Sequence, residues 1–396
     1  MGWQPHRFSG LSARAEGPTD VRVDAVTGAR PMRIIGVSVP DVSDWQDAVP
    51  NGKWSRFFTA LAQRFELVDV VQADVSRRAN YLNLARNFRP NKGEWLTRAG
   101  LSQSLARQRT EVVEQALRGY EGSYDLVMQL QTICSPPAAA PYAIYTDNTM
   151  ALTQRFYPAW SPSSPRLAKQ WIQFEADVCQ CATSVFTFSE FARRSVIEDY
   201  GCAPERVVAV GAGANQIVGE LPEQGHGTPT ALFVGVDFAR KGGQVLLEAW
   251  PTVRRHAPGA ELIIVGPTRD PGSTEVAGVR WMGRLTPDEV AALYRSASVF
   301  VLPSLFEPWG HVFLEAMGNG LPCIAASCCA MPEIVDDGIT GRLVAPGKVE
   351  PLAAALTELL TDPDKAAEMG RAAHAKVMHG DRWSDVIDRV ATHLAS

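Results

Sequence analysis

The chain has 396 residues, of which 46% are hydrophobic and 20% are charged, and its formal net charge is -5. This length predicts two to three domains with buried cores, and the composition excludes a disordered, collagen-like or coiled-coil chain. The mild acidity disfavours a nucleic-acid binder, because such proteins present a basic surface. No apolar run reaches the roughly 18 residues that a membrane-spanning helix needs.

The seven cysteines show neither a CxxC pair nor the ligand spacing of a zinc site. We therefore expect reduced, buried thiols in a cytoplasmic protein. The first 31 residues are polar and lack the apolar core of a signal peptide. We expect residues 1–31 to form an N-terminal tail.

From residue 33 onward, short apolar segments alternate with longer amphipathic ones. A first set of strands is expected at 33–39, 67–71, 125–130, 142–146, 184–188 and 206–210, and a second set at 231–236, 261–266, 298–302, 322–326 and 342–345. Helices are expected near 54–64, 103–118, 167–182, 189–199, 242–255, 287–296, 310–319, 351–361, 363–378 and 383–394. Nearly continuous Val, Ile, Leu and Phe runs are typical of parallel strands that are buried on both faces. The alternation therefore predicts an α/β fold with doubly wound, Rossmann-like parallel sheets.

Turn-forming residues over 219–230 separate the two sets of strands and are typical of an interdomain linker. We expect an N-terminal domain over 32–220, a C-terminal domain over 228–380, and a last helix in 381–396 that can pack on the N-terminal domain. Ligands bind beyond the carboxyl ends of parallel strands. Two such domains that face each other would form a binding cleft there.

A dense motif follows the strand expected at 298–302. Glu307 lies on a short loop, Gly310 precedes a helix, and Glu315 lies on that helix, with seven residues between it and Glu307. A helix N-terminus offers free N–H groups and partial positive charge, and Gly310 lets a phosphate approach the backbone. Glu315 can accept the two hydroxyls of a ribose and Glu307 a sugar hydroxyl. Each glutamate taken alone is equally typical of a solvated surface carboxylate.

A second motif follows the strand expected at 231–236. Gly235 ends that strand, Arg240 and Lys241 follow on a loop, and a helix begins at Gly242. Two cations beside a helix start can bind a diphosphate and offset the negative charge that develops when it leaves. An isolated Arg-Lys pair is otherwise an ordinary basic helix cap.

Together these strings resemble glycosyltransferase family 4, whose retaining enzymes have the GT-B fold of two Rossmann-like domains. The resemblance rests on Glu307-x7-Glu315 with Ala316-Met317, on Gly320-x-Pro322, and on Glu333-Ile-Val-x-x-Gly338-x-x-Gly341-x-Leu-Val344. The string from Gly235 to Lys241-Gly242 supports it. The resemblance covers about 230–345 well and the rest of the chain only in layout.

The resemblance implies that the C-terminal domain binds a nucleotide-diphosphate sugar. Lys241 and Arg240 would hold the diphosphate, Glu307 the donor sugar and Glu315 the ribose. The amides of Gly310, His311 and Val312 would contact phosphate or sugar. Arg284 would lie at the base-binding loop, and Gly235 beside the donor.

Two departures from the family pattern concern residues that are expected to bind the donor. Many members have an arginine directly after the glycine that matches Gly235, and here that residue is Val236. Arg240 can supply the missing charge. His311 stands where the family varies, and it can either bond to sugar or phosphate or simply pack.

The N-terminal domain gives weaker signals. A strand runs into Asp147, where the resemblance implies a residue that orients or stabilises the reacting sugar; Asp147 also fits an Asx turn or a helix cap. Gly52 is the nearest match to the family's glycine-rich loop and would contact the acceptor.

The stretch 77–109 carries eight Lys or Arg against Glu94 alone, with Tyr81, Phe88 and Trp95 interspersed. It fits either an anionic-acceptor surface, a peripheral contact with the inner membrane face, or an ordinary solvated face.

The leading hypothesis is a metal-independent, retaining hexosyltransferase-like enzyme without a cofactor, whose partners are a nucleotide-sugar donor and a sugar, lipid-linked or small-molecule acceptor. A glycoside hydrolase that uses Glu307 and Glu315 would have no need of the cationic loop. An oxidoreductase would need a GxGxxG turn, which is absent from the sequence. A non-catalytic nucleotide-sugar-binding protein or partner subunit remains the alternative.

Overall fold

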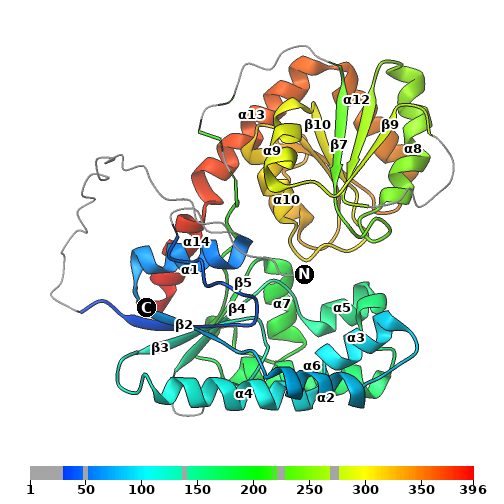
Figure 1. Ribbon diagram of the computed structural model, residues 1–396. Helices are drawn as coiled ribbons and strands as arrows, with labels where there is room; N and C mark the ends of the chain where they lie inside the picture. The colour runs from blue at the N-terminus through cyan, green and yellow to red at the C-terminus, as the bar shows by residue number, and fades with distance from the viewer. Residues whose placement is uncertain are drawn as a thin grey trace, which may run out of the picture. The chain divides into compact units, whose positions relative to one another are not determined.

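The structure is a computed structural model that describes residues 30–47, 52–135, 141–216, 218–219, 221, 228–267 and 276–396. Apart from Arg30 and Pro31, the expected N-terminal tail lies outside the described residues, as does much of the expected linker. Residues 32–396 form one compact unit. Within its described residues, this unit holds two parallel sheets of six strands each, flanked by helices (Figure 1).

The first sheet has the strand order β2-β1-β3-β4-β5-β6. Its strands are β1 (Arg33–Ser38), β2 (Glu66–Gln72), β3 (Leu126–Leu130), β4 (Tyr142–Thr146), β5 (Ser184–Thr187) and β6 (Val207–Ala209). Its helices are α1 (Gly52–Arg64), α2 (Arg77–Arg86), α3 (Lys92–Gly100), α4 (Gln103–Arg118), α5 (Met150–Phe156), α6 (Pro165–Cys181) and α7 (Glu190–Glu198), with short 3-10 turns η1 (Pro158–Trp160) and η2 (Pro204–Arg206).

Side chains of the first sheet alternate between two apolar cores, because successive residues of a strand point to opposite faces. Ile34 joins a core with Phe57 of α1 and Val386 of α14 (Trp383–Leu394). Ile35 joins a different core with Val113 of α4 and helix α6. Each strand is therefore apolar on both sides, which explains the nearly continuous hydrophobic runs of the sequence.

The second sheet has the strand order β12-β11-β10-β7-β8-β9. Its strands are β7 (Thr230–Val234), β8 (Glu261–Val265), β9 (Val279–Gly283), β10 (Val299–Leu302), β11 (Cys323–Ala326) and β12 (Gly341–Val344). Its helices are α8 (Gly243–His256), α9 (Pro287–Ser296), α10 (His311–Gly318), α11 (Met331–Ile334), α12 (Val349–Thr361) and α13 (Pro363–Gly380). Helices α8 and α12 pack against each other, α12 contacts β7, β10 and β11, and α10 contacts β11.

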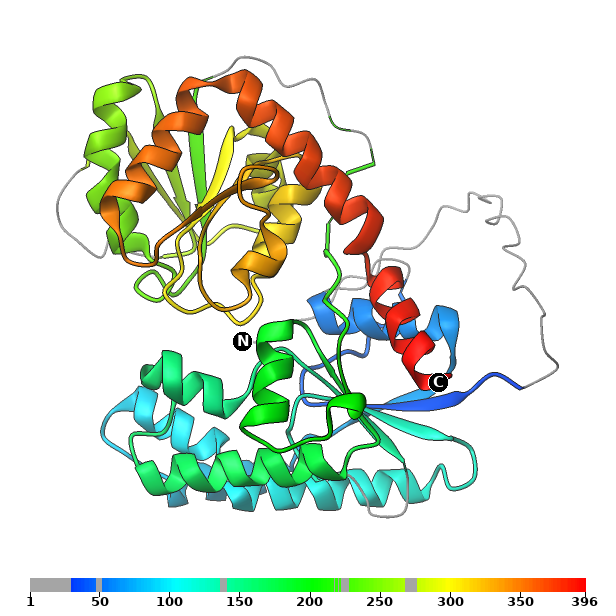
Figure 2. The ribbon, with the colours of Figure 1, turned by 180° about the vertical axis from the view of Figure 1, so that it is seen from behind.

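The chain returns to the first sheet at its C-terminus. Helix α14 packs against α1, and Figure 2 shows these red and blue helices side by side. Arg389 of α14 donates to the Val210 carbonyl at 2.8 Å, and His393 lies 3.2 Å from the Ser184 hydroxyl. The last helix therefore covers the same face of the first sheet as α1.

The expected doubly wound α/β fold is confirmed, and the differences are local. Strand β9 was not expected, because it lies at the edge of the sheet and its residues alternate in exposure instead of forming an apolar run. Helices α2, α3 and α5 were not expected either, because they are short and polar or lie in mixed sequence. The domain boundaries at residues 220 and 228 stay predictions. None of the described helices is both long and apolar enough to cross a membrane.

Candidate functional site

The loop from β7 to α8 brings two cations to the carboxyl end of the second sheet. Gly242 adopts φ 74° and directly precedes α8. A methyl group added to Gly235 would lie 2.2 Å from Lys241 Cδ, so the lysine side chain passes directly over this glycine. Arg240 is 6% exposed, and its carbonyl accepts the Leu305 amide at 2.8 Å. The loop is thus fastened to the loop that follows β10.

Both cations meet the carboxylate of Glu307, which is 7% exposed. Lys241 Nζ lies 2.9 Å and Arg240 Nη1 3.3 Å from Glu307 Oε2. Arg240 also donates to the Phe306 carbonyl at 2.7 Å and pairs with Asp237 at 3.3 Å. Two positive charges therefore share one buried carboxylate, which holds them in place, and with Asp237 the four side chains carry no net charge.

Helix α10 begins directly beside this group. Gly310 adopts φ 93°, and a methyl group added there would lie 2.9 Å from the Phe313 ring and 3.1 Å from Glu307 Cγ. The first N–H groups of a helix have no partner within the helix and offer partial positive charge. His311 and Val312 occupy these first positions and are partly exposed. The arrangement suits an anionic ligand with several oxygen atoms.

Glu315 lies one helical turn further along α10 and faces polar groups. Asn215 donates to Glu315 Oε1 at 3.1 Å, and the Tyr294 hydroxyl donates to Oε2 at 3.4 Å. Burial raises the pKa of Glu315, while these two hydrogen bonds and the charge of Arg56 oppose that rise. The carboxylate is therefore held in a fixed orientation by residues from two distant segments.

Asp147 follows β4 and forms a second polar group with Lys53 and Gln131. Lys53 Nζ lies 3.4 Å from Asp147 Oδ2, and Gln131 Nε2 donates to Oδ1 at 3.0 Å. Burial alone would raise the pKa of Asp147, but the charge of Lys53, the Gln131 hydrogen bond and nearby His311 together lower it. Gln131 adopts φ 61°, a conformation uncommon outside glycine, and it directly follows β3. Gly52, the first residue of α1, immediately precedes Lys53.

His311 packs between aromatic rings. Its ring is stacked on Trp383 at 6.1 Å and meets Phe188 edge-on at 5.8 Å. Burial, reinforced by the charge of Lys53, lowers the pKa of His311 to about 3. The imidazole is therefore neutral near pH 7, so it can exchange hydrogen bonds with a ligand but contributes no charge.

Aromatic residues of the turn η1 cover the cation group. The Trp160 ring lies 4.3 Å from the Arg240 guanidinium carbon, and Tyr157 stacks on Phe306 at 6.0 Å. Such a ring face attracts a cation and shields it from water. These contacts join the segment between α5 and α6 to the loops that carry Arg240 and Glu307.

The structure brings three of the predicted residues together directly: Arg240, Lys241 and Glu307. Arg284 lies exposed just after β9, and within the described part of the chain no hydrogen bond or ion pair joins it to that group. Sequence reasoning missed Asn215, Tyr294, Lys53, Gln131 and Trp160 as site members. Only the turn-like string around Asn215 and the basic residue after Gly52 hinted at any of them. In the described ranges, no group of three or more His, Cys, Asp or Glu side chains is placed to hold a metal ion.

Residues 228–362 match the family described as glycosyl transferases group 1. The chain is 33% identical over 183 residues to a GDP-mannose-dependent alpha-(1-6)-phosphatidylinositol monomannoside mannosyltransferase of Mycobacterium tuberculosis, covering 42% of this chain and 47% of that protein. It is 30% identical over 275 residues to a D-inositol 3-phosphate glycosyltransferase of Corynebacterium kroppenstedtii, covering 61% of this chain and 58% of that protein. The chain thus spans about half the length of the curated relatives it matches.

Among solved structures, the sucrose-phosphate synthase of Thermosynechococcus elongatus aligns with a TM-score of 0.65 at 18% identity, covering 92% of this chain and 98% of that one. At this identity the likeness concerns the fold alone. The GT-B fold is confirmed, and so is the resemblance to group 1 glycosyltransferases.

Proposed function

We propose that this chain, whose residues 228–362 belong to the glycosyl transferases group 1 family, transfers a sugar from a nucleotide-diphosphate sugar to an acceptor hydroxyl. The observation that supports this most is the convergence of Arg240 and Lys241 on Glu307 at the start of α10. A diphosphate carries the charge and the oxygen atoms that this arrangement can bind. A hydrolase that uses two carboxylates has no use for the paired cations.

In the proposed donor complex, Arg240, Lys241 and the first amides of α10 hold the diphosphate. Glu307 accepts a hydroxyl of the donor sugar. Glu315 accepts the ribose hydroxyls, with its carboxylate oriented by Asn215. Since these positive groups offset the diphosphate charge, we propose that the reaction needs no metal ion and no cofactor.

The proposed transfer follows the retaining route of glycosyltransferase family 4. The bond between the anomeric carbon and the diphosphate oxygen breaks with oxocarbenium character. The acceptor oxygen forms its new bond on the same face, and its proton passes to the leaving diphosphate. The fixed charges of Arg240 and Lys241 stabilise the diphosphate as it leaves. In this proposal Asp147, which is held by Lys53 and Gln131, stabilises or orients the reacting sugar.

Nucleotide-sugar binding tests this proposal first. We expect one class among UDP-, GDP-, ADP-, CDP- and TDP-sugars to raise the thermal midpoint, because a ligand of the native state stabilises it by mass action. Lys241→Ala should abolish that rise, and Lys348→Ala, an exposed lysine before α12, should keep it. With the selected donor, transfer in the presence of EDTA and retention of the anomeric configuration would support the metal-free retaining route.

Two results would count against the donor site. One is the absence of any shift at donor concentrations well above typical dissociation constants. The other is an equal loss of shift in Lys241→Ala and Lys348→Ala. A shift without transfer to any acceptor would favour a non-catalytic nucleotide-sugar-binding protein.

We further propose that this enzyme acts in the cytoplasm and docks on an anionic membrane through the surface of residues 77–96. Four large apolar side chains of this surface are exposed: Tyr81 (72%), Leu82 (48%), Phe88 (57%) and Leu96 (48%). Basic residues lie near them in the sequence, at Arg77, Arg78, Arg86, Arg89 and Lys92. Apolar insertion combined with attraction to anionic lipid is the usual basis of peripheral binding.

Vesicle sedimentation tests the membrane contact. The chain should bind phosphatidylglycerol-containing vesicles, and more weakly at high salt because charge attraction is screened. The double variant Tyr81→Ser/Phe88→Ser should lose at least half of the bound fraction. Ile339→Ser, which removes an apolar side chain 61% exposed outside this surface, is the matched control. Equal binding of all three proteins would contradict the proposal.

A further inference from the structure

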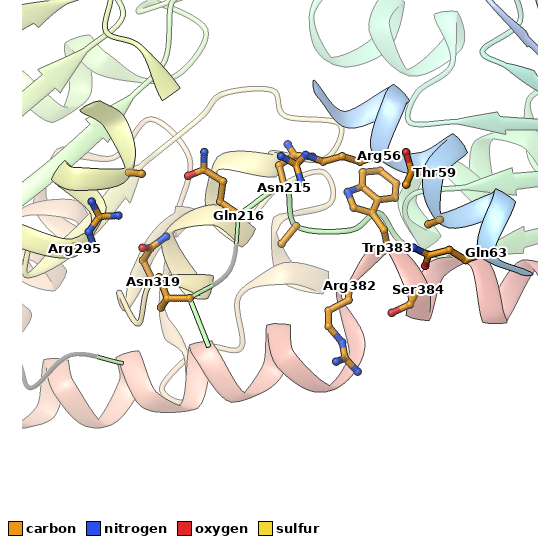
Figure 3. A pocket seen from close by; sticks show the side chains of 14 residues that line it. Arg56, Thr59, Gln63, Asn215, Gln216, Arg295, Asn319, Arg382, Trp383 and Ser384 are labelled. Atoms are coloured by element: carbon orange, nitrogen blue, oxygen red, sulfur yellow. The ribbon is translucent and has the colours of Figure 1, made fainter. Parts of the chain in front are cut away.

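A pocket of about 580 Å³ lies between α1, the segment after β6, α9 and the start of α14 (Figure 3). Its lining includes none of Arg240, Lys241, Glu307 or Asp147. The pocket is therefore separate from the proposed diphosphate site. Its volume lies in the range of small-molecule binding sites.

The charges that line this pocket are all positive. Three arginines line it, Arg56, Arg295 and Arg382, and no aspartate or glutamate does. Arg382 bonds to Asp385 of its own helix and points away from the others in Figure 3. Arg56 from α1 and Arg295 from α9 stand on opposite walls. Guanidinium groups of this kind favour a ligand with phosphate oxygens.

Several buried polar atoms of the lining have no hydrogen-bond partner. They include Asn319 Oδ1 and Trp383 Nε1, whose side chains are only 5% and 7% exposed. Asn215 Oδ1 and Arg56 Nε are further examples. A buried polar atom without a partner costs free energy, so these four atoms would be stabilised by a polar group brought within their reach.

We propose that this pocket binds a phosphate-bearing small molecule of sugar-phosphate size. Arg295 would hold the phosphate from one wall and Arg56 would contact the ligand from the other, while Oδ1 of Asn215 and Oδ1 of Asn319 would accept from hydroxyl groups. The Trp383 indole offers both a donor and an apolar edge, which suits a polyol ring. Asn215 also donates to Glu315, so the pocket shares one residue with the proposed ribose contact.

Isothermal titration calorimetry with three probes tests this site: glucose 6-phosphate, inorganic phosphate and glucose. We expect glucose 6-phosphate to bind and glucose alone not to bind. Arg295→Gln should weaken binding at least tenfold, and Arg56→Gln should do the same. Arg295 is exposed, so its variant should fold normally, which a thermal midpoint would verify. Arg118→Gln, an exposed arginine at the end of α4, is the matched control and should bind like the native chain.

The other outcomes separate the possible ligands and sites. Inorganic phosphate binding as tightly as glucose 6-phosphate would identify free phosphate as the ligand of the two arginines. Binding that is lost in Lys241→Ala but kept in Arg295→Gln would assign the phosphate to the diphosphate site and overturn the proposal. Absence of binding by both phosphate probes would overturn it as well.

Discussion

Glu307→Gln should lower the free energy of unfolding by roughly 3 kcal/mol, because it removes the charge that Arg240 and Lys241 share in a mostly buried site. Arg240 keeps Asp237 as a partner, whereas Lys241 loses the only ion pair it forms among the described residues. The glutamine is close in shape to glutamate, so the effect reports charge and not packing. Chemical denaturation with urea measures it.

The same variant should lose at least about a hundredfold in sugar transfer, since misplaced cations no longer face the leaving diphosphate. A nucleoside diphosphate should nevertheless raise its thermal midpoint more than that of the native chain. The ligand would replace the negative charge that the substitution removed. This opposite response of stability and turnover distinguishes a charge-holding role from simple unfolding.

Glu248→Gln is the matched control, because Glu248 is an exposed carboxylate of α8 in the same part of the chain. A surface change of this kind should alter the free energy of unfolding by less than about 0.5 kcal/mol. Equal stability losses in Glu307→Gln and Glu248→Gln would show that the two cations do not depend on Glu307. Unchanged transfer by Glu307→Gln would remove Glu307 from the proposed mechanism.

Much of the fold could be predicted from the sequence because parallel strands buried on both faces leave an unmistakable apolar run. Val299–Leu302 is fully buried, and its strand was expected almost to the residue. Strand β9 has the burial pattern of a half-exposed edge and gave no such run. Local hydrophobicity therefore predicted the central strands and the edge strands β2, β6 and β12, and it missed the edge strand whose exposure alternates.

The residues of the candidate site likewise differ in how well the sequence predicts them. Lys241 and Glu307 could be singled out because each belongs to a compact motif after one strand. The partners of Asp147 could not, since Lys53 and Gln131 come from two other segments and meet it only in the folded chain. Gln131 gives no local signal, because its left-handed backbone is set by the turn after β3. Contacts between distant segments depend on sheet order, which local periodicity does not determine.

Gly242→Ala should lower the free energy of unfolding by about 3 kcal/mol or more, because two costs add at one position. The residue adopts φ 74°, and its new methyl group would lie 2.0 Å from the Pro303 carbonyl oxygen, which is backbone and cannot rotate away. The β7–α8 loop would have to move away from the β10–α10 loop. This movement would break the hydrogen bond between Lys241 and Glu307. Nucleotide-sugar stabilisation should therefore vanish along with the lost stability.

Two glycines of the same part of the chain separate these costs. Gly347→Ala meets a similar backbone, φ 70°, but only an ordinary 3.8 Å contact, so it should lose about 1 kcal/mol from strain alone. Gly259→Ala has open space and no positive φ, so its unfolding midpoint in urea should barely change. If Gly242→Ala proved no less stable than Gly347→Ala, the close approach of Gly242 to Pro303 would make no contribution to the loss of stability. If the loss of stability increases from Gly259→Ala to Gly347→Ala to Gly242→Ala, most of the loss in Gly242→Ala comes from the contact between the two loops that hold Lys241 and Glu307.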